Sequence, residues 1–303
     1  MTINNPFHQG ELDLQCLAGE QLNAARLSQM IQPVIPAAAL KFVSQQSFIW
    51  IGIEDRDKMI WACVLTGSPG FMNTNSGELL EITLDENRPV PDHWFDMLEA
   101  GKFIGCLLIE LETRRRLRVN GVIKTINKRQ LHITVQHAYP NCPKYIRRRE
   151  LLGKPVLSTV NFINSGSDLN EQLINIIRHS DTSFVASVGP NGADVSHRGG
   201  PSGFIRCESN TKITVPDYQG NGLFNSLGNF KVNPVGGILV VDFEKGYFLQ
   251  LSGAINIVLD TDYPNVATNG THRYWQMDIQ QWQLFQLSPN TSWETLEYSP
   301  YNP

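Results

Sequence analysis

An internal repeat constrains the fold of this chain more than any other feature. Residues 105–123 read GCLLIELETRRRLRVNGVI, and residues 237–255 read GILVVDFEKGYFLQLSGAI. Aligned without a gap, the two segments share two glycine positions, Gly105 with Gly237 and Gly121 with Gly253. They also share four further positions: Leu107 with Leu239, Glu112 with Glu244, Leu117 with Leu249, and Ile123 with Ile255. The motifs GSPGF (67–71) and GPSGF (200–204) precede the two segments at almost the same distance. This periodicity predicts two copies of one structural unit.

The length of the chain fits this division. A sequence of 303 residues can form two domains, each with its own core. We therefore expect four segments: an N-terminal leader (1–40), a first copy (41–146), a connector (147–180) and a second copy (181–303).

Each copy is predicted to contain about six strands and one short helix. In the first copy we expect strands over 48–53, 59–65, 79–84, 104–111, 115–124 and 130–136, with a helix over 91–102. In the second copy we expect strands over 184–188, 193–197, 204–208, 212–216, 237–243, 247–258 and 274–287, with a helix near 222–230. Short β-branched runs joined by Gly- and Asn-rich turns favour a small antiparallel barrel. The fold class is therefore mainly β, as two tandem barrels.

The connector is predicted to be mostly helical. Residues 168–177 form an amphipathic stretch, and Ser167-Asp168 is a suitable N-terminal cap for it. In the leader, residues 22–35 show partial helical spacing before Pro33 and Pro36 interrupt it.

Composition excludes several classes of partner. The net charge of −4 provides no basic field for nucleic acid or anionic lipid, and we interpret the two arginine runs (114–116 and 147–149) as solvated. No apolar run is long enough to span a bilayer, and the first 15 residues are too polar for a secretory signal. Five scattered cysteines indicate reduced thiols in a cytoplasmic protein. Neither the cysteines nor the histidines show metal-ligand spacing, so we expect no metal.

The two copies differ in polar chemistry at one strand. The second copy reads DVSHRGGPSG at 194–203, where the first reads WACVLTG at 61–67. Ser196 and Arg198 offer the hydroxyl and guanidinium donors that a dianionic phosphate requires. The glycine pair Gly199-Gly200 allows close backbone approach.

A second element of the same copy strengthens this prediction. Gly220-Asn221-Gly222 precedes the expected helix, and free amides at a helix start attract phosphate. Taken singly, each motif has an ordinary explanation: a turn with its cap, or a surface arginine in a salt bridge. Together they predict one phosphate-sized site in the second copy.

These motifs resemble the split-barrel flavin-binding family related to pyridoxamine 5′-phosphate oxidase. The resemblance covers most of residues 180–258. It is carried by SHRGG (196–200), PDYQGN (216–221), FNSLGN (224–229), NPVG (233–236) and LQLSG (249–253). The first copy resembles the barrel in its apolar skeleton, and NCPKYI (141–146) is similar to a segment of two-barrel members.

The resemblance implies two tandem FMN-binding split barrels, with an FMN site in a groove between them. Ser196 and Arg198 would hold the phosphate with the amides of Asn221 and Gly222, next to His197 and Gly199. The resemblance also places three groups nearby: Asn225, Gln250 at the ring or ribityl chain, and Lys144 with Tyr145 from the side of the first copy.

This sequence departs from the family pattern at two points. Related members often carry an arginine after Gly-Asn, whereas this chain has Gly222-Leu223, so its phosphate site is less cationic. The substrate-binding arginine and histidine pattern of the oxidase has no match near the C-terminus.

The leading hypothesis is an FMN-dependent oxidoreductase that uses a small-molecule substrate or electron donor. Flavin chemistry of this kind need not use a protein acid or base, so no catalytic residue is assigned. His197 is either a proton donor near the ring or a structural histidine. Two alternatives stay open: a non-catalytic flavin-binding module, and a split barrel that uses haem or a deazaflavin, with His272 as the first haem-ligand candidate. Pairing of two chains into a homodimer also stays open.

Overall fold

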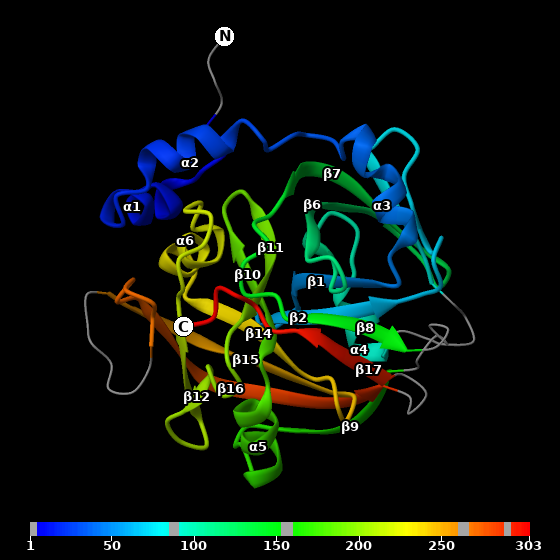
Figure 1. The fold of residues 1–303 in the computed structure, drawn as a ribbon. Helices are drawn as coiled ribbons and strands as arrows, with labels where there is room; N and C mark the ends of the chain where they lie inside the picture. The colour runs from blue at the N-terminus through cyan, green and yellow to red at the C-terminus, as the bar shows by residue number, and fades with distance from the viewer. Residues whose placement is uncertain (1–4, 85–90, 153–159, 260–266, 288–291) are drawn as a thin grey trace.

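The computed structural model describes residues 5–84, 91–152, 160–259, 267–287 and 292–303 (Figure 1). Antiparallel strands dominate these residues, so the prediction of a mainly β fold is confirmed. No helix in the described part of the chain is long and apolar enough to cross a membrane.

The first large sheet comes from the N-terminal half of the chain. Its strand order is β2-β1-β5-β6-β7-β4-β3. The strands are β1 (Phe48–Glu54), β2 (Ile60–Thr66), β3 (Met72–Asn73), β4 (Leu79–Thr83), β5 (Phe103–Glu110), β6 (Arg115–Ile126) and β7 (Gln130–Pro140). The β1–β2 turn forms because the Asp55 carboxylate accepts hydrogen bonds from the amides of Asp57 and Met59 and from the Trp61 indole.

The second large sheet has the order β11-β10-β14-β15-β16-β13-β12, and β9 pairs with β16. Its strands are β9 (Val160–Gly166), β10 (Thr182–Gly189), β11 (Gly192–Gly199), β12 (Arg206–Cys207), β13 (Lys212–Pro216), β14 (Val235–Asp242), β15 (Tyr247–Val258) and β16 (Tyr274–Leu287). Leaving β9 aside, each strand occupies the same place in the order as its counterpart in the first sheet. The alignment of residues 105–123 with 237–255 therefore corresponds to the β5–β6 pair of one sheet and the β14–β15 pair of the other.

The two sheets pack directly against each other. Trp50 of β1 stacks on Phe184 of β10 with ring centroids 3.6 Å apart and planes 9° apart. A Cβ on Gly105 of β5 would lie 2.6 Å from the Cα of Asp194 on β11, so only glycine permits this approach. One hydrophobic core cluster includes residues of both sheets. The fold is thus held together across the boundary between the two halves.

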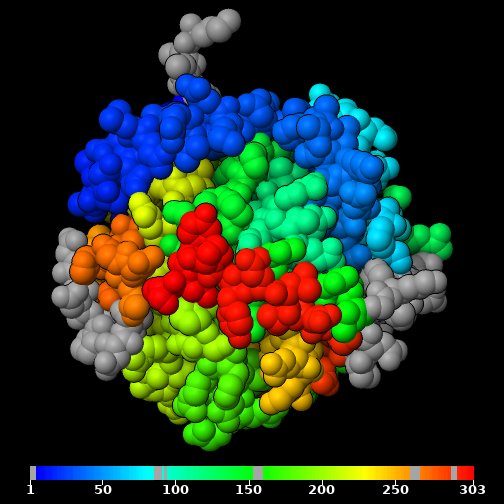
Figure 2. Space-filling view, in the orientation of Figure 1, coloured from blue at the N-terminus to red at the C-terminus, as the bar shows by residue number. Residues whose placement is uncertain are grey.

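The connector is not mostly helical, which corrects the prediction for residues 147–180. Its described residues contain β8 (Arg148–Leu152), β9 and a single helix, α5 (Glu171–His179). β8 pairs with β17 (Ser292–Glu297), a strand that the sequence pattern did not indicate. Helix α5 is capped by the side chain of Asn170, which accepts from the Leu173 amide, rather than by Ser167-Asp168. On the face of the molecule shown in Figure 2, the C-terminal residues, coloured red, cross the surface.

The remaining helices lie mostly in the N-terminal segment. They are α1 (Gln9–Leu17), α2 (Gln21–Ser28), the 3-10 turn η1 (Ala37–Ala39), α3 (Leu40–Gln45), α4 (Asp92–Met97) and α6 (Asn225–Val232). The helix predicted over 91–102 therefore ends at Met97. Helices α1 and α2 lie over α6 (Figure 1), so the N-terminal segment covers part of the second half.

Candidate functional site

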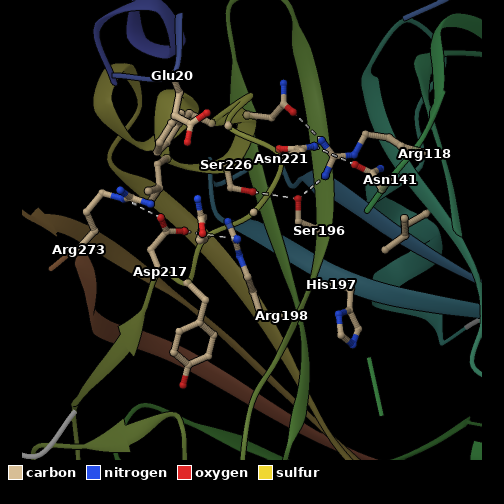
Figure 3. A pocket seen from close by; sticks show the side chains of 18 of the residues that line it. Glu20, Arg118, Asn141, Ser196, His197, Arg198, Asp217, Asn221, Ser226 and Arg273 are labelled. Atoms are coloured by element: carbon tan, nitrogen blue, oxygen red, sulfur yellow. Dashed lines mark hydrogen bonds and ion pairs between the residues drawn. The ribbon is translucent and has the colours of Figure 1, made fainter. Parts of the chain in front are cut away.

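A small cavity lies where both halves of the chain meet. Strand β11 and the start of α6 form its second-half walls, and strand β6 closes it from the first half (Figure 3). Its volume is about 90 Å³, which is room for a group the size of phosphate. It is lined by Glu20, Leu107, Arg116, Arg118, Asn141, Ser196, His197, Arg198, Asp217, Tyr218, Gln219, Gly220, Asn221, Gly222, Phe224, Asn225, Ser226, Leu227 and Arg273.

The charged lining of the cavity is mainly cationic. It contains four arginines and two carboxylates, those of Glu20 and Asp217. Asp217 is buried between two of the arginines: Arg273 Nε donates to its Oδ2 at 3.0 Å, and Arg198 Nη1 lies 3.4 Å from its Oδ1. This carboxylate fixes the direction of the Arg198 guanidinium, which stands in Figure 3 between Asp217 and Ser196.

Arg118 reaches the cavity from β6 and joins the two halves. Its Nη2 donates to the backbone oxygen of Val195 at 3.2 Å and to the hydroxyl of Ser196. Its Nη1 donates to Asn225 Oδ1 at 3.0 Å and lies 3.1 Å from Asp194 Oδ1. Burial opposes the charge of Arg118, but Tyr139, Asp194 and Glu11 together outweigh burial and raise the pKa of Arg118. The guanidinium therefore stays charged and orders the wall around Ser196.

Three guanidinium groups of the wall retain unused donors. The Nε atoms of Arg116, Arg118 and Arg198 are buried and have no hydrogen-bond partner among the described residues. Burial, together with the charges of Arg118 and Arg198, lowers the pKa of Arg116 to about 9. Buried donors without partners are costly to the fold. The site is therefore short of negative charge.

The loop before α6 supplies backbone donors. No hydrogen bond within the described ranges uses the amides of Gly220, Asn221 or Gly222. Phe224, the N-cap residue, has φ 60° and makes no side-chain cap, so the first-turn amides of α6 also lack a capping side chain. The helix begins at Asn225 and not at Gly222, which corrects the predicted start. The unusual backbone of Phe224 turns the loop around the cavity.

Six of the predicted site residues meet at this cavity. Its lining includes Ser196, His197, Arg198, Asn221, Gly222 and Asn225. Ser226 Oγ donates to Ser196 Oγ at 3.0 Å, which links the helix start to β11. The predicted pair of elements, a polar strand end and a Gly-Asn-Gly loop, therefore forms one structural unit.

His197 lies on the opposite face of β11 from Ser196 and Arg198. Its backbone borders the cavity, but its ring packs edge-to-face on Phe184 at 5.6 Å and lies apart from the arginines in Figure 3. Burial, with the nearby charges of Arg116, Arg149 and Arg198, holds the pKa of His197 well below its usual range. This is the geometry of a neutral structural histidine.

The other predicted residues lie around the cavity or away from it. Gly199 contacts the carbonyl of Tyr145, and the Tyr145 hydroxyl donates to Gln219 O at 3.2 Å, so both support the wall from behind. Lys144 lies 5.7 Å from the centre of the Tyr301 ring and does not line the cavity. Gln250 is fully buried elsewhere, where its Oε1 accepts from the Trp94 indole. His272 is exposed and outside the walls.

Several wall residues were not predicted from the sequence. Arg116, Arg118, Asp217, Arg273 and Glu20 were all missed. The repeat did contain a signal for Arg118, since it aligns with Gln250 in the ungapped comparison. The arginine runs were also misinterpreted. Arg116 borders the cavity, and Arg149 is buried with Asp181 at 2.6 Å, so neither run is simply solvated.

The N-terminal helices cover the loop side of the cavity. Asn23 Nδ2 donates to Asn221 O at 3.0 Å, and Gln15 Nε2 donates to Leu223 O at 3.1 Å. Glu11 is buried against α6, where its Oε1 accepts from Asn225 Nδ2 at 2.6 Å. Burial, and next the charge of Asp194, raise the pKa of Glu11 to about 8. The N-terminal segment therefore contributes to the walls of the site, with Glu20 in the lining.

Within the described ranges, no group of three His, Cys, Asp or Glu side chains is placed to hold a metal ion. All five cysteines are free, and Cys63 and Cys106 are buried.

A scan against protein-family models and a search of curated proteins each found no match. Solved structures similar to part of this chain include HupZ of Group A Streptococcus, with 16% identity and a TM-score of 0.31 over 40% of this chain and 95% of HupZ. A putative pyridoxamine 5′-phosphate oxidase from Lactobacillus delbrueckii is similar with 13% identity and a TM-score of 0.32, over 40% of this chain and 98% of the oxidase. HutZ, the haem storage protein of Vibrio cholerae, is similar with 15% identity and a TM-score of 0.25, over 45% of this chain and 99% of HutZ. Likenesses of this size assign no ligand and no residue role.

Proposed function

We propose that this chain binds a phosphate-bearing flavin, FMN, with its phosphate in the cavity between the two halves. The observation that carries the proposal is the charge and the free donors of the wall: four arginines against two carboxylates, beside loop amides that make no hydrogen bond among the described residues. Guanidinium forks and free amides at a helix start are the donors that bind a dianion.

Each wall residue has a distinct part in this proposal. Arg198 and Arg116 would contact the phosphate, with the amides of Asn221 and Gly222 from the loop. Arg118 and Asp217 would hold these donors in place through the contacts described above. A three-ring flavin exceeds a cavity of about 90 Å³, so only its phosphate end would lie inside. When bound, FMN would supply hydride and electron transfer.

We also propose that the two halves are two copies of one split barrel. The shared strand order, and the matching register of β5–β6 and β14–β15, support this. In this arrangement a single chain would build the groove that single-barrel members of the resembling family build from two chains.

The proposed activity is that of an oxidoreductase with a small-molecule electron donor. The rival is a non-catalytic flavin-binding module. Reduced nicotinamide, added to FMN-loaded protein in air, separates the two. Rapid bleaching of the flavin absorption band together with consumption of the reduced nicotinamide supports the oxidoreductase, whereas colour without turnover supports the module.

The binding proposal is tested by titrating FMN into the purified protein and measuring binding by calorimetry and by flavin fluorescence. Arg198→Ala is expected to weaken FMN binding by about 1.5–3 kcal/mol, the scale of a charge-assisted contact. Arg115→Ala is the matched control, because Arg115 is exposed and lies outside the cavity, with its guanidinium 4.7 Å from the centre of the Phe42 ring and 3.9 Å from Glu110. Equal affinity of the Arg198→Ala variant and the unmodified protein would show that the phosphate binds elsewhere.

A further inference from the structure

The contacts around Arg118 recur around Gln250, with different residues. Arg118 pairs with Leu107 across β5–β6, and Gln250 pairs with Leu239 across β14–β15, so the two side chains occupy equivalent positions. Arg118 donates to Val195 O and to the Ser196 hydroxyl of β11. Gln250 Nε2 donates to Ala62 O at 2.6 Å and to Cys63 Sγ at 3.1 Å, both on β2.

The helix that faces each of these strands also takes part in both places. Asn225, the first residue of α6, accepts from Arg118 at 3.0 Å. Trp94, in the first turn of α4, donates from its indole to Gln250 Oε1 at 3.0 Å. Ser196 pairs with Val185 of β10, and Cys63 pairs with Ile51 of β1, so Ser196 and Cys63 occupy equivalent strand positions. The chain therefore contains two grooves of the same construction.

Only one of the two grooves is open. Around Arg118 the walls enclose the cavity of about 90 Å³. Around Gln250 the indole of Trp94 fills the space: it is 1% exposed, and its ring centroid lies 4.8 Å from that of Phe285. Cys63 and Gln250, the counterparts of two cavity residues, are fully buried behind it.

We propose that the groove formed by α4, β2 and β15 is a closed counterpart of the anion site, and that Trp94 is the residue that closes it. The chain then offers one ligand site and not two. The stoichiometry rests on the proposed function, whereas the closure itself does not and can be tested without any ligand.

Closure is tested by the reactivity of thiols in the two grooves. Cys16, Cys142 and Cys207 are replaced by serine, which leaves Cys63 and the fully buried Cys106. The folded protein is treated with N-ethylmaleimide, and the modified residues are identified by mass spectrometry. In this background Cys63 is expected to be inert, while a thiol introduced by Ser196→Cys at the equivalent position of the open groove reacts.

Removal of the indole by Trp94→Ala, or by the milder Trp94→Leu, is expected to increase the rate of Cys63 modification by at least about tenfold. Cys106 controls for unfolding, because an unfolded chain would expose both thiols. Trp275→Ala is the matched variant: it removes a fully buried indole from the second half and leaves Trp94 in place. Selective reaction of Cys63 only after loss of Trp94 supports closure by this residue.

Three results would overturn the inference: reaction of Cys63 in the unmodified background, an inert Cys63 in both folded Trp94 variants, or an inert Ser196→Cys thiol. Calorimetry with FMN adds an independent readout. One FMN per chain agrees with both proposals, and two per chain would refute closure while the proposed function stands. No binding would refute the proposed function while the thiol result still decides closure.

Discussion

At the scale of single residues, the site is defined by how its arginines are neutralised. Asp217 holds Arg198 and Arg273, and Asp194 lies beside Arg118, but Arg116 has no carboxylate partner among the described residues. Charges of one sign in a partly dry cavity repel one another, so the folded chain holds unfavourable electrostatic energy that a bound anion would relieve. Anion binding should therefore be accompanied by stabilisation of the fold.

His197 makes stability depend on pH. Because its folded pKa lies below that of the unfolded chain, unfolding takes up a proton as pH falls through about 6.5. The contribution of His197 to stability is therefore complete above pH 6.5 and is lost below it, by up to about 2 kcal/mol at pH 5. Urea unfolding at pH 5 and pH 7.5, compared between His197→Phe and the unmodified protein, isolates this contribution from the opposing one of Glu11. His197→Phe is expected to reduce the loss of stability at pH 5, and an unchanged pH dependence in that variant would exclude His197 as the cause.

At the scale of elements, the contact of α1 with α6 is the most sensitive. A Cβ on Gly228 would lie 2.4 Å from Glu11 Cγ and 2.8 Å from its Cα and N. Two of these atoms are backbone and cannot rotate away, so overpacking outweighs the better helix propensity of alanine. Gly228→Ala should destabilise the fold by about 1–3 kcal/mol in urea unfolding. Gly220→Ala is the control, since a Cβ there meets nothing within 4 Å; equal stability of the two variants would contradict this packing.

The same contact gives a second pH effect of opposite sign. Glu11 ionises near pH 8 when folded but near 4.5 when unfolded, so unfolding releases a proton between these values. Stability should fall by about 1–2 kcal/mol from pH 6.5 to pH 8, a range above the titration of His197. Glu11→Gln removes the titrating group and should flatten this slope. If the slope persists in the variant, another group must carry the proton.

At the scale of the whole molecule, the two halves share one core. Trp50 and Phe184 stack across the boundary, and the cluster around them contains residues of both sheets. We expect a single unfolding transition that coincides in far-ultraviolet circular dichroism and tryptophan fluorescence. Trp50→Ala should lower the free energy of unfolding by about 3–5 kcal/mol without separating the halves, while Trp50→Phe should cost less. Two resolved transitions would show that the halves fold independently.

The strands were largely predictable because their signals are local. The hairpin of β1 and β2 and the long strands β5, β6, β14 and β15 follow from β-branched runs bounded by turn residues. The connector was misassigned because β8 and β9 have partners far away in sequence: β17 for one and β16 for the other. Pairing over such separations leaves no periodic signal in the strand itself.

The sequence by itself determined a mainly β chain, and it located the polar strand end and loop that hold Ser196, Arg198 and Asn221. Only the tertiary structure decided which residues of the other half face them. Arg118 and Arg116 reach the cavity because the two sheets pack face to face, and Gln250 lies in the second groove for the same reason. The similarity of the two segments predicts equivalent strands in the two halves, but contacts between the halves depend on packing, which residue spacing does not encode.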